Sequence, residues 1–387
     1  MMIPYGRQDI NQADIDSVVD VLKSDFLTQG PQVPLFEKAV TSYCGALHGV
    51  AVNSATSALH IACLSLGLGK DDILWTSPNT YVASANCALY CGAQVDFVDI
   101  DSQTYNMSID ALKIKLEKAE IDGTLPKVVI PVHFAGQPCD MPAIHKLSEH
   151  YDFKIIEDAS HAIGATHKKI KVGACTHSDI TVFSFHPVKI ITTGEGGMAI
   201  TNNEELGNRM RVFCSHGVTN NKAFMQSRPL NEIWNYQQIE LGYNYRMTDI
   251  QAALGLSQIS RLDEYIIRRH EIANLYDTEL ESLPVKVPWQ DPKTYSSYHL
   301  YPILINEHES KKSQLELYDA LRENGIMVNL HYIPVYRQVY YESLGFKKGY
   351  CPNAENYFNH TISIPMFPSL DHESQLKVIA IIAQELK

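Results

Sequence analysis

The chain has 387 residues, of which 45% are hydrophobic and 20% charged, which suits a globular protein with one large and one smaller domain. Its formal net charge of −12 argues against a surface for nucleic acids or anionic membranes, because both need concentrated positive charge. No apolar run reaches the roughly 18 residues of a membrane span, and the first residues lack a signal-peptide pattern. We therefore expect a cytoplasmic protein that binds neither nucleic acid nor membrane.

The eight cysteines are scattered along the chain, several of them in apolar runs. Cys87 and Cys91 are the only close pair, and no second pair or His-x-x-x-His motif completes a zinc site. We therefore expect reduced, mostly buried thiols and no metal site.

The first 45 residues predict two helices separated by a polar turn. Apolar residues recur at helical spacing over 12–22, and a second such pattern begins at Leu35. The turn between them, 27–31, is rich in hydrogen-bonding groups, and by itself it indicates only a loop.

From residue 48 to about 200, short β-prone runs alternate with helical stretches. The predicted strands are 49–52, 73–76, 95–98, 128–132, 153–156 and 180–183, and another apolar run covers 198–201. The predicted helices are 57–66, 82–91, 109–119 and 142–149. This alternation predicts an α/β fold with a mainly parallel sheet and helices on both faces, and ligands of such sheets bind beyond the carboxyl ends of the strands.

The rest of the chain has a different pattern. Residues 206–245 are less regular, and a helical run from 248 to about 283 is long enough to connect two domains. An α+β pattern follows, with strands expected at 299–305, 327–331 and 361–365 and helices at 310–323 and 372–386. We therefore divide the chain into a large domain, 1–255, and a linking helix with a small C-terminal domain, 256–387.

Lys189 is the first candidate for chemistry. The apolar run that begins at Ile180 stops at His186-Pro187, presents Lys189, and enters a Thr/Gly-rich turn before the next apolar run. A lysine held between two apolar strands loses solvation, which lowers its pKa and favours the nucleophilic free amine. Lys189 is then suited to form an imine with an aldehyde cofactor. The alternative is an ordinary loop lysine whose stem lies on apolar surface.

Three further features fall at the ends of predicted strands. Small hydroxyl residues at 53–58, between a strand and a helix, can converge on a phosphate or simply cap the helix. Asp158 closes a buried strand, where it can pair with a protonated pyridine nitrogen or cap the next turn, and His161 can meet a ring oxygen or belong to the core. Tyr81 can stack on a ring or pack in the core. Together with Lys189, these groups match what pyridoxal phosphate (PLP) needs.

Longer motifs carry a family resemblance. They are Asn-Ser-Ala-Thr-Ser-Ala-Leu at 53–59, Glu-Asp-Ala-Ser-His-Ala at 157–162, Ser-Phe-His-x-x-Lys-x-x-Thr-Thr-Gly-Glu-Gly-Gly at 184–197, Ser-His-Gly at 215–217 and Gly-Tyr-Asn-Tyr-Arg-Met-Thr-Asp-Ile-Gln-Ala-Ala at 242–253. From about residue 10 to its end, the chain resembles the sugar aminotransferases of the DegT/DnrJ group, which are PLP-dependent transferases of fold type I.

The resemblance implies roles for individual residues. Lys189 would bond to the cofactor aldehyde and move the proton, Asp158 would pair with the pyridine nitrogen, Tyr81 would stack on the ring and His161 would lie near its hydroxyl. The phosphate would be held by Thr56, Ser57 and Ser184. The family often has Gln at the position of His161 and Phe or Trp at that of Tyr81, which puts the detailed hydrogen bonding in doubt.

The resemblance also implies a homodimer and a substrate mouth. Asn244 would reach the phosphate of the neighbouring subunit's cofactor. The substrate mouth would be lined by Thr28, Gln29 and His331, with Arg246 or Arg211 meeting an anionic group.

The runs at 234–238 and 331–336 are most similar to the branch that transfers an amino group from L-glutamate to C4 of a UDP-linked 4-keto-6-deoxy-N-acetylhexosamine, on the way to pseudaminic acid. The alternatives are another nucleotide-4-ketosugar aminotransferase, of the perosamine or amino-arabinose type, and a non-catalytic PLP-binding regulator. Dehydrases of the family carry His in place of the lysine, and Lys189 argues against that reading.

Overall fold

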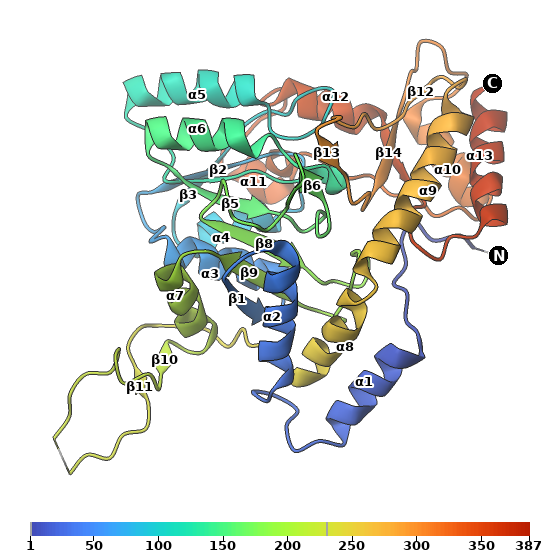
Figure 1. Ribbon diagram of the computed structural model, residues 1–387. Coiled ribbons are helices and arrows are strands. Elements are labelled where there is room, and N and C mark those ends of the chain that lie inside the picture. The colour runs from blue at the N-terminus through green and yellow to red at the C-terminus, as the bar shows by residue number, and fades with distance from the viewer. Residues whose placement is uncertain (1, 230) are drawn as a thin grey trace.

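A computed structural model describes residues 2–229 and 231–387, and a seven-stranded sheet lies at its centre (Figure 1). In the order β1-β9-β8-β5-β4-β2-β3, β9 pairs antiparallel with β1 and β8, and the other neighbours pair in parallel. The strands are β1 (His48–Val52), β2 (Ile73–Thr76), β3 (Gln94–Phe97), β4 (Val128–Ile130), β5 (Lys154–Asp158), β8 (Ile180–Ser184) and β9 (Gly197–Thr201). The prediction of a mainly parallel sheet is confirmed.

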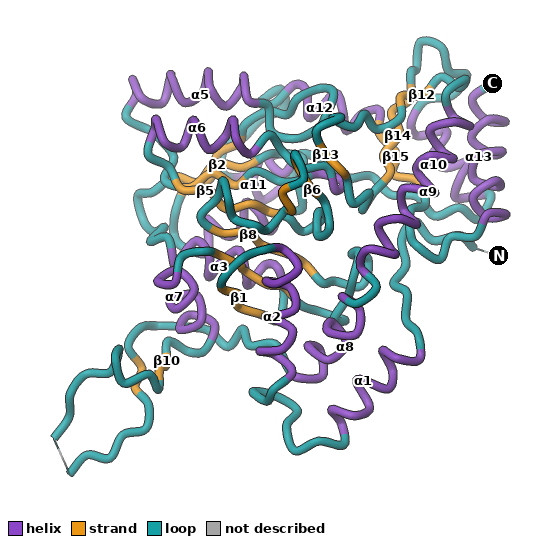
Figure 2. The backbone as a smooth tube through the Cα atoms, viewed as in Figure 1, coloured by secondary structure: helices purple, strands orange, loops and turns teal. Residues whose placement is uncertain are grey.

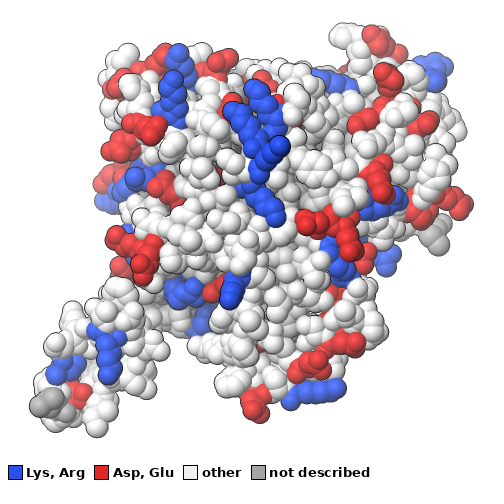
Figure 3. Space-filling view, in the orientation of Figure 1, with Lys and Arg blue, Asp and Glu red and all other residues white. Residues whose placement is uncertain are grey.

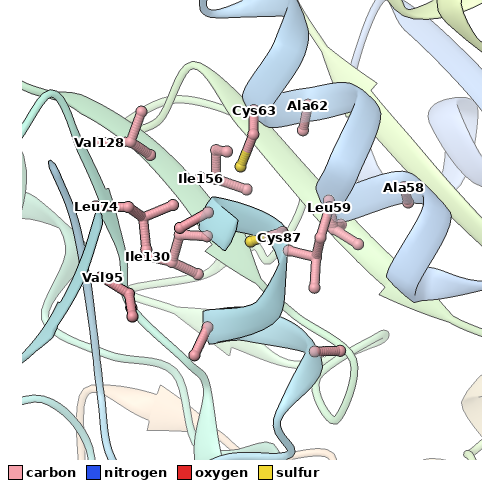
Figure 4. Packing of buried hydrophobic residues seen from close by; sticks show 14 of the residues in the cluster. Ala58, Leu59, Ala62, Cys63, Leu74, Cys87, Val95, Val128, Ile130 and Ile156 are labelled. Atoms are coloured by element: carbon pink, nitrogen blue, oxygen red, sulfur yellow. The ribbon is translucent and has the colours of Figure 1, made fainter. Parts of the chain in front are cut away.

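Helices cover both faces of this sheet. They are α3 (Ala55–Ser65), α4 (Ala83–Tyr90), α5 (Ile109–Asp122), α6 (Met141–Tyr151) and α7 (Glu204–Cys214). Successive strand residues point to opposite faces, so Val128 and Ile130 pack in one core with Leu59 of α3 and Cys87 of α4 (Figure 4). Val129, between them, packs in a second core under α5 and α6. This alternation explains why continuous apolar runs mark strands that are buried on both faces.

The N-terminal helices α1 (Gln12–Leu22) and α2 (Gln32–Cys44) pack against α8 (Asp249–Ile259). Asp249 of α8 fixes the turn before α2. Its buried carboxylate accepts hydrogen bonds from the backbone N–H groups of Gly30 (2.8 Å) and Gln32 (2.7 Å). The single helix predicted over 248–283 is wrong in one respect. It breaks before α9 (Leu262–Leu280), where Arg261 leaves helical geometry and pairs with Asp14 of α1 at 2.7 Å.

The C-terminal region contains a three-stranded sheet and several helices. Its elements are β12 (Val285–Lys286), β14 (Tyr301–Ile305), β15 (Thr361–Ile364), α10 (Gln314–Glu323), α11 (Val339–Ser343), α12 (Pro352–His360) and α13 (His372–Leu386). Of these helices, α11 packs through Tyr341 in the core of α3 and α4. The strand predicted at 327–331 is wrong, because this segment makes only a single bridge, between Asn329 and Ser363. The Asn329 side chain accepts the N–H of Leu330, which diverts a donor that a strand would need. The predicted domain boundary at 255 stays a prediction.

The segment after β9 also differs from expectation. Its beginning forms α7, with Asn203 as N-cap, two acids in the first turn and Arg211 in the last turn, all of them recognisable helix signals. An extension then projects from the body of the protein, as Figures 1 and 2 show. It carries the short strands β10 (Val218–Thr219) and β11 (Gln237–Gln238). The remaining short elements are β6 (Thr166–His167), β7 (Ile170–Lys171), β13 (Thr294–Tyr295), η1 (Phe134–Gly136) and η2 (Val335–Arg337).

Across residues 2–229 and 231–387, no helix is long and apolar enough to cross a membrane. Acidic and basic side chains are interspersed over the face drawn in Figure 3. All eight cysteines lie in the described part and have free thiols, and seven of them are buried.

Candidate active site

A cavity of about 1010 Å³ contains most of the predicted site residues. Of those residues, the ones that line it are Thr56, Ser57, Tyr81, Asp158, His161, Ser184, Lys189 and His331. Several follow the carboxyl ends of β1, β2, β5 and β8, where an α/β sheet brings separate loops together. Segments far apart in the sequence thus meet in one site.

The first turn of α3 forms an anion cradle at this cavity. Ser54 caps the helix by accepting the N–H of Ser57 at 3.1 Å, and the Ser57 hydroxyl donates to Asn53 at 2.7 Å. Amides in the first turn of a helix have no intrahelical partner, and the helix dipole adds positive potential there. Gly197 of β9 permits the close approach, because a Cβ on it would lie 2.5 Å from the nitrogen of Ala55. The arrangement suits a phosphate group.

Asp158 ends β5 and is only 4% exposed. Its Oδ2 accepts the hydroxyl of Ser84 at 2.6 Å, and its Oδ1 accepts the N–H of Ser160 at 3.1 Å. Within the described residues no ion pair engages this carboxylate, so its remaining lone pairs are available to a cationic ligand atom. A buried carboxylate without a charge partner is costly, and a protonated ring nitrogen would relieve that cost.

On the opposite side of β5, Glu157 forms a buried pair with His133, with 2.7 Å between Oε2 and Nε2. Burial alone would lower the pKa of His133, but its contacts with Cys139 and Glu157 raise that pKa to about 10. Burial likewise works to raise the pKa of Glu157, and the hydrogen bond and charge of His133 bring it below its ordinary value instead. The pair fixes β5 immediately beside Asp158.

Lys189 follows β8 and points its amine into the cavity, where Nζ lies 3.5 Å from Nε2 of His299. Burial lowers the pKa of Lys189 from 10.5 to about 8, although the negative charge of Asp158 acts in the opposite direction. The amine is therefore partly deprotonated near neutral pH and able to act as a nucleophile.

Histidines and a tyrosine also line the cavity. Burial and the nearby Lys189 charge lower the pKa of His331 to about 3 and hold the pKa of His161 and of His299 well below the ordinary value. His161 Nε2 lies 3.2 Å from the hydroxyl of Tyr332, and His331 Nδ1 lies 2.9 Å from that of Ser363. These imidazoles are neutral at pH 7, so they recognise a ligand by hydrogen bonds rather than by charge.

Comparison with known proteins identifies the family. The sequence model of the DegT/DnrJ/EryC1/StrS aminotransferase family matches residues 8–383. The chain belongs to this family. It is 40% identical, over 94% of its own length and 92% of the relative's, to the UDP-4-amino-4,6-dideoxy-N-acetyl-beta-L-altrosamine transaminase of Campylobacter jejuni.

Two solved structures are similar over the whole aminotransferase chain. Helicobacter pylori PseC, an aminotransferase involved in the biosynthesis of pseudoaminic acid, has a TM-score of 0.89 and 29% identity, covering 100% of this chain and 99% of PseC. The PLP form of the putative sugar aminotransferase Spr1654 from Streptococcus pneumoniae also has a TM-score of 0.89 and 29% identity, covering 100% of both chains. The predicted family and fold are confirmed, and the protein is a sugar aminotransferase.

The remaining predicted positions of this aminotransferase lie apart from the cavity wall. Thr28 and Gln29 are exposed in the turn before α2, where Thr28 bridges to Thr248. Asn244 is exposed beside Ser215 at the base of the projecting extension, and its proposed contact with a neighbouring subunit stays a prediction.

The two candidate arginines have different surroundings. Arg246 donates to the hydroxyl of Ser215 at 3.0 Å and does not line the cavity. Arg211 is held by Glu37 and by the carbonyl of Gly49, so its charge is already compensated and it is a poor candidate for an anionic ligand. Tyr81 lies at the cavity with 64% of its surface exposed, which leaves its ring face accessible.

Sequence reasoning overlooked three residues of the aminotransferase site. Ser84 lies within α4, His299 lies just before β14 and Tyr332 lies in the loop after Asn329. Only Tyr332 carried a signal, because it belongs to the His-Tyr-x-Pro run that supported the resemblance. Within the described ranges, no group of three or more His, Cys, Asp or Glu side chains is arranged to hold a metal ion.

Proposed function

We propose that this enzyme transfers the amino group of L-glutamate to C4 of a UDP-linked 4-keto-6-deoxy-N-acetylhexosamine, with PLP as its cofactor. The observation that carries the proposal is the amine of Lys189, whose pKa is lowered to about 8, in one cavity with the anion cradle and with Asp158. The enzyme would act in the cytoplasm as a homodimer.

The chemistry of the donor set fits PLP. The first-turn amides of α3, with Thr56, Ser57 and Ser184, would hold the phosphate. Asp158 would pair with the ring nitrogen through the lone pairs that Ser84 leaves free. His161, buried and neutral, has Nδ1 without a partner among the described residues, so it has hydrogen-bonding capacity left for a bound ring. Tyr81 would cover one face of that ring.

When bound, PLP supplies an aldehyde that takes up an amino group and a ring that withdraws electrons from the carbon losing a proton. Lys189 performs the proton transfers at Nζ. A pKa near 8 suits both directions of transfer at neutral pH, since the amine and the ammonium forms are both populated. Asp158 adds a negative charge that acts on Lys189, and the neutral histidines add no positive charge that would compete with Lys189.

The substrate assignment is supported by relatives. The transaminase from Campylobacter jejuni is named for a UDP-linked amino sugar, and the Helicobacter pylori structure is named as an aminotransferase of pseudoaminic acid biosynthesis. Lys189 is the only lysine or arginine among the described residues that line the cavity. Positive contacts to a diphosphate would therefore come from elsewhere, and in a homodimer Arg246 of a second copy would supply one. Asn244 of that copy would reach the phosphate of the cofactor.

The test is mass spectrometry of the product formed from purified UDP-, dTDP- and GDP-linked 4-ketosugars with glutamate. We expect amination, seen as replacement of the carbonyl oxygen by an amino group, with strong preference for the UDP sugar. Preference for another nucleotide would refute the substrate, and full amino transfer by Lys189→Ala would refute the assignment of Lys189.

A further inference from the structure

We propose that His299 is a positioning residue that holds the amine of Lys189 in place by accepting a hydrogen bond from it at Nε2. The inference rests on the proposed function of Lys189. It concerns a residue that no motif of the sequence singled out.

The two side chains meet inside the cavity. Nζ of Lys189 lies 3.5 Å from Nε2 of His299, and His299 is only 4% exposed. A neutral imidazole has one nitrogen that accepts and one that donates, so Nε2 can take an N–H of the amine only if His299 stays uncharged. Burial, together with His161 and Lys189, holds the pKa of His299 well below its ordinary value and keeps it neutral.

The backbone that presents His299 is held by a buried arginine. Arg269 of α9 is 1% exposed, and its Nη1 donates to the carbonyls of Tyr298 (2.9 Å), His299 (3.3 Å) and Met366 (3.1 Å). Burial lowers the pKa of Arg269 to about 9, which shows how unfavourable this location is for a guanidinium. A buried charge that contacts several carbonyls orders the segment they belong to.

Gly136 packs closely against the segment 297–299. Gly136 has φ +102, and a Cβ there would lie 2.5 Å from Oγ of Ser297 and 2.8 Å from the nitrogen of Tyr298. The carbonyl of Gly136 accepts the N–H of Ser297 at 3.1 Å, and the Ser297 hydroxyl donates to the carbonyl of His161 at 2.7 Å. The position of His299 is therefore tied both to α9 and to the loop after β5.

The other charged and titratable groups around this contact are Asp158, His161, His331 and Arg269. Asp158 attracts the ammonium form of Lys189, and the neutral histidines do not repel it. Without a second contact, the flexible lysine stem would leave the amine free to rotate toward Asp158. His299 supplies that contact and limits the rotation of the amine.

The experiment measures the pKa of Lys189 in cofactor-free protein. Trace acylation across the neutral and alkaline range, quantified for the Lys189 peptide by mass spectrometry, gives the midpoint of amine reactivity. In His299→Leu the ammonium loses its acceptor, so we expect the midpoint to fall by about one pH unit. His299→Gln, whose amide oxygen can accept, should restore much of the difference. The matched control is His60→Leu, which removes a buried imidazole outside the cavity and should leave the midpoint unchanged.

A midpoint in His299→Leu that stays the same or rises would overturn the inference. Should that variant fail to fold, ¹⁵N NMR of histidine-labelled Lys189→Met provides the reciprocal measurement. The Nε2 resonance of His299 should shift when the amine is lost, and an unchanged resonance would contradict the contact. In the holoenzyme, kcat of His299→Leu should fall about tenfold or more with little change in KM for glutamate. If the wild-type enzyme aminates no ketosugar, the proposed function fails instead, while the labelling result still decides the role of His299.

Discussion

Replacing Lys189 with methionine should stabilise the cofactor-free protein at neutral pH. The cavity removes water from the amine, and this burial lowers the pKa of Lys189 from 10.5 to about 8. Methionine has a similar length and no charge, so it keeps the packing of the stem and removes the cost of burying an ammonium group.

The magnitude follows from the difference in pKa between the folded and unfolded chains. At roughly 1.4 kcal/mol per pKa unit, the ammonium form of Lys189 costs up to about 3 kcal/mol of the free energy of unfolding. Between pH 8 and pH 10.5 the unfolded chain binds one more proton at this site than the folded chain, so wild-type stability rises with pH in that window. The advantage of Lys189→Met is therefore complete below pH 8 and disappears as the pH approaches 10.5.

The assay is thermal or chemical denaturation of both cofactor-free proteins at a series of pH values. Only the difference between the two proteins matters, because other tyrosines and lysines titrate equally in both. Lys113→Met provides the control, since the Lys113 side chain is 61% exposed and, among the described residues, pairs only with Glu117 on the surface of α5. Its effect on stability should be within about 0.5 kcal/mol at neutral pH. The reasoning would be refuted by a Lys189→Met protein that is no more stable than wild type at pH 7, or whose advantage persists unchanged at high pH.

Three further changes test other parts of the site. Glu157→Gln should lower the free energy of unfolding by about 3 kcal/mol, because it removes the negative charge that pairs with the buried His133 imidazolium. Calorimetry checks this, with the exposed Glu149→Gln as control, and equal stability of the two variants would contradict it. Gly197→Ala should weaken PLP binding about tenfold, since the new Cβ would push on the first turn of α3. Fluorescence titration measures the affinity for PLP, with Gly69→Ala as the control because its new Cβ meets no atom within 4 Å. Equal affinities of the two variants would exclude the effect. Asp158→Asn should reduce kcat/KM on the order of 100-fold by removing charge stabilisation, and near-normal turnover in a steady-state assay would reject the pairing with the ring nitrogen.

Much of the secondary structure followed from local patterns. The strands at 73–76 and 180–184 and the helices at 12–22 and 372–386 agree with the structure within a residue, because hydrophobic periodicity and caps act over short separations. The positions of Lys189 and Asp158 could be predicted for the same reason, since each follows directly on a buried strand. The prediction of one continuous helix was wrong at Arg261, because this residue leaves helical geometry and pairs with Asp14, a distant residue that the local pattern does not reveal.

The contacts that complete the site could not be read from the sequence. Ser84 reaches Asp158 across 74 positions, and His299 reaches Lys189 across 110. Chain separation of this size leaves no periodic signal in the sequence. These residues are brought together by the order of the strands in the sheet and by the contacts of α9 with the segment around His299. The sequence by itself determined which chemical groups stand at the strand ends. Only the tertiary structure decided which of them share one cavity, because hydrogen bonds and desolvation depend on distances that folding alone creates.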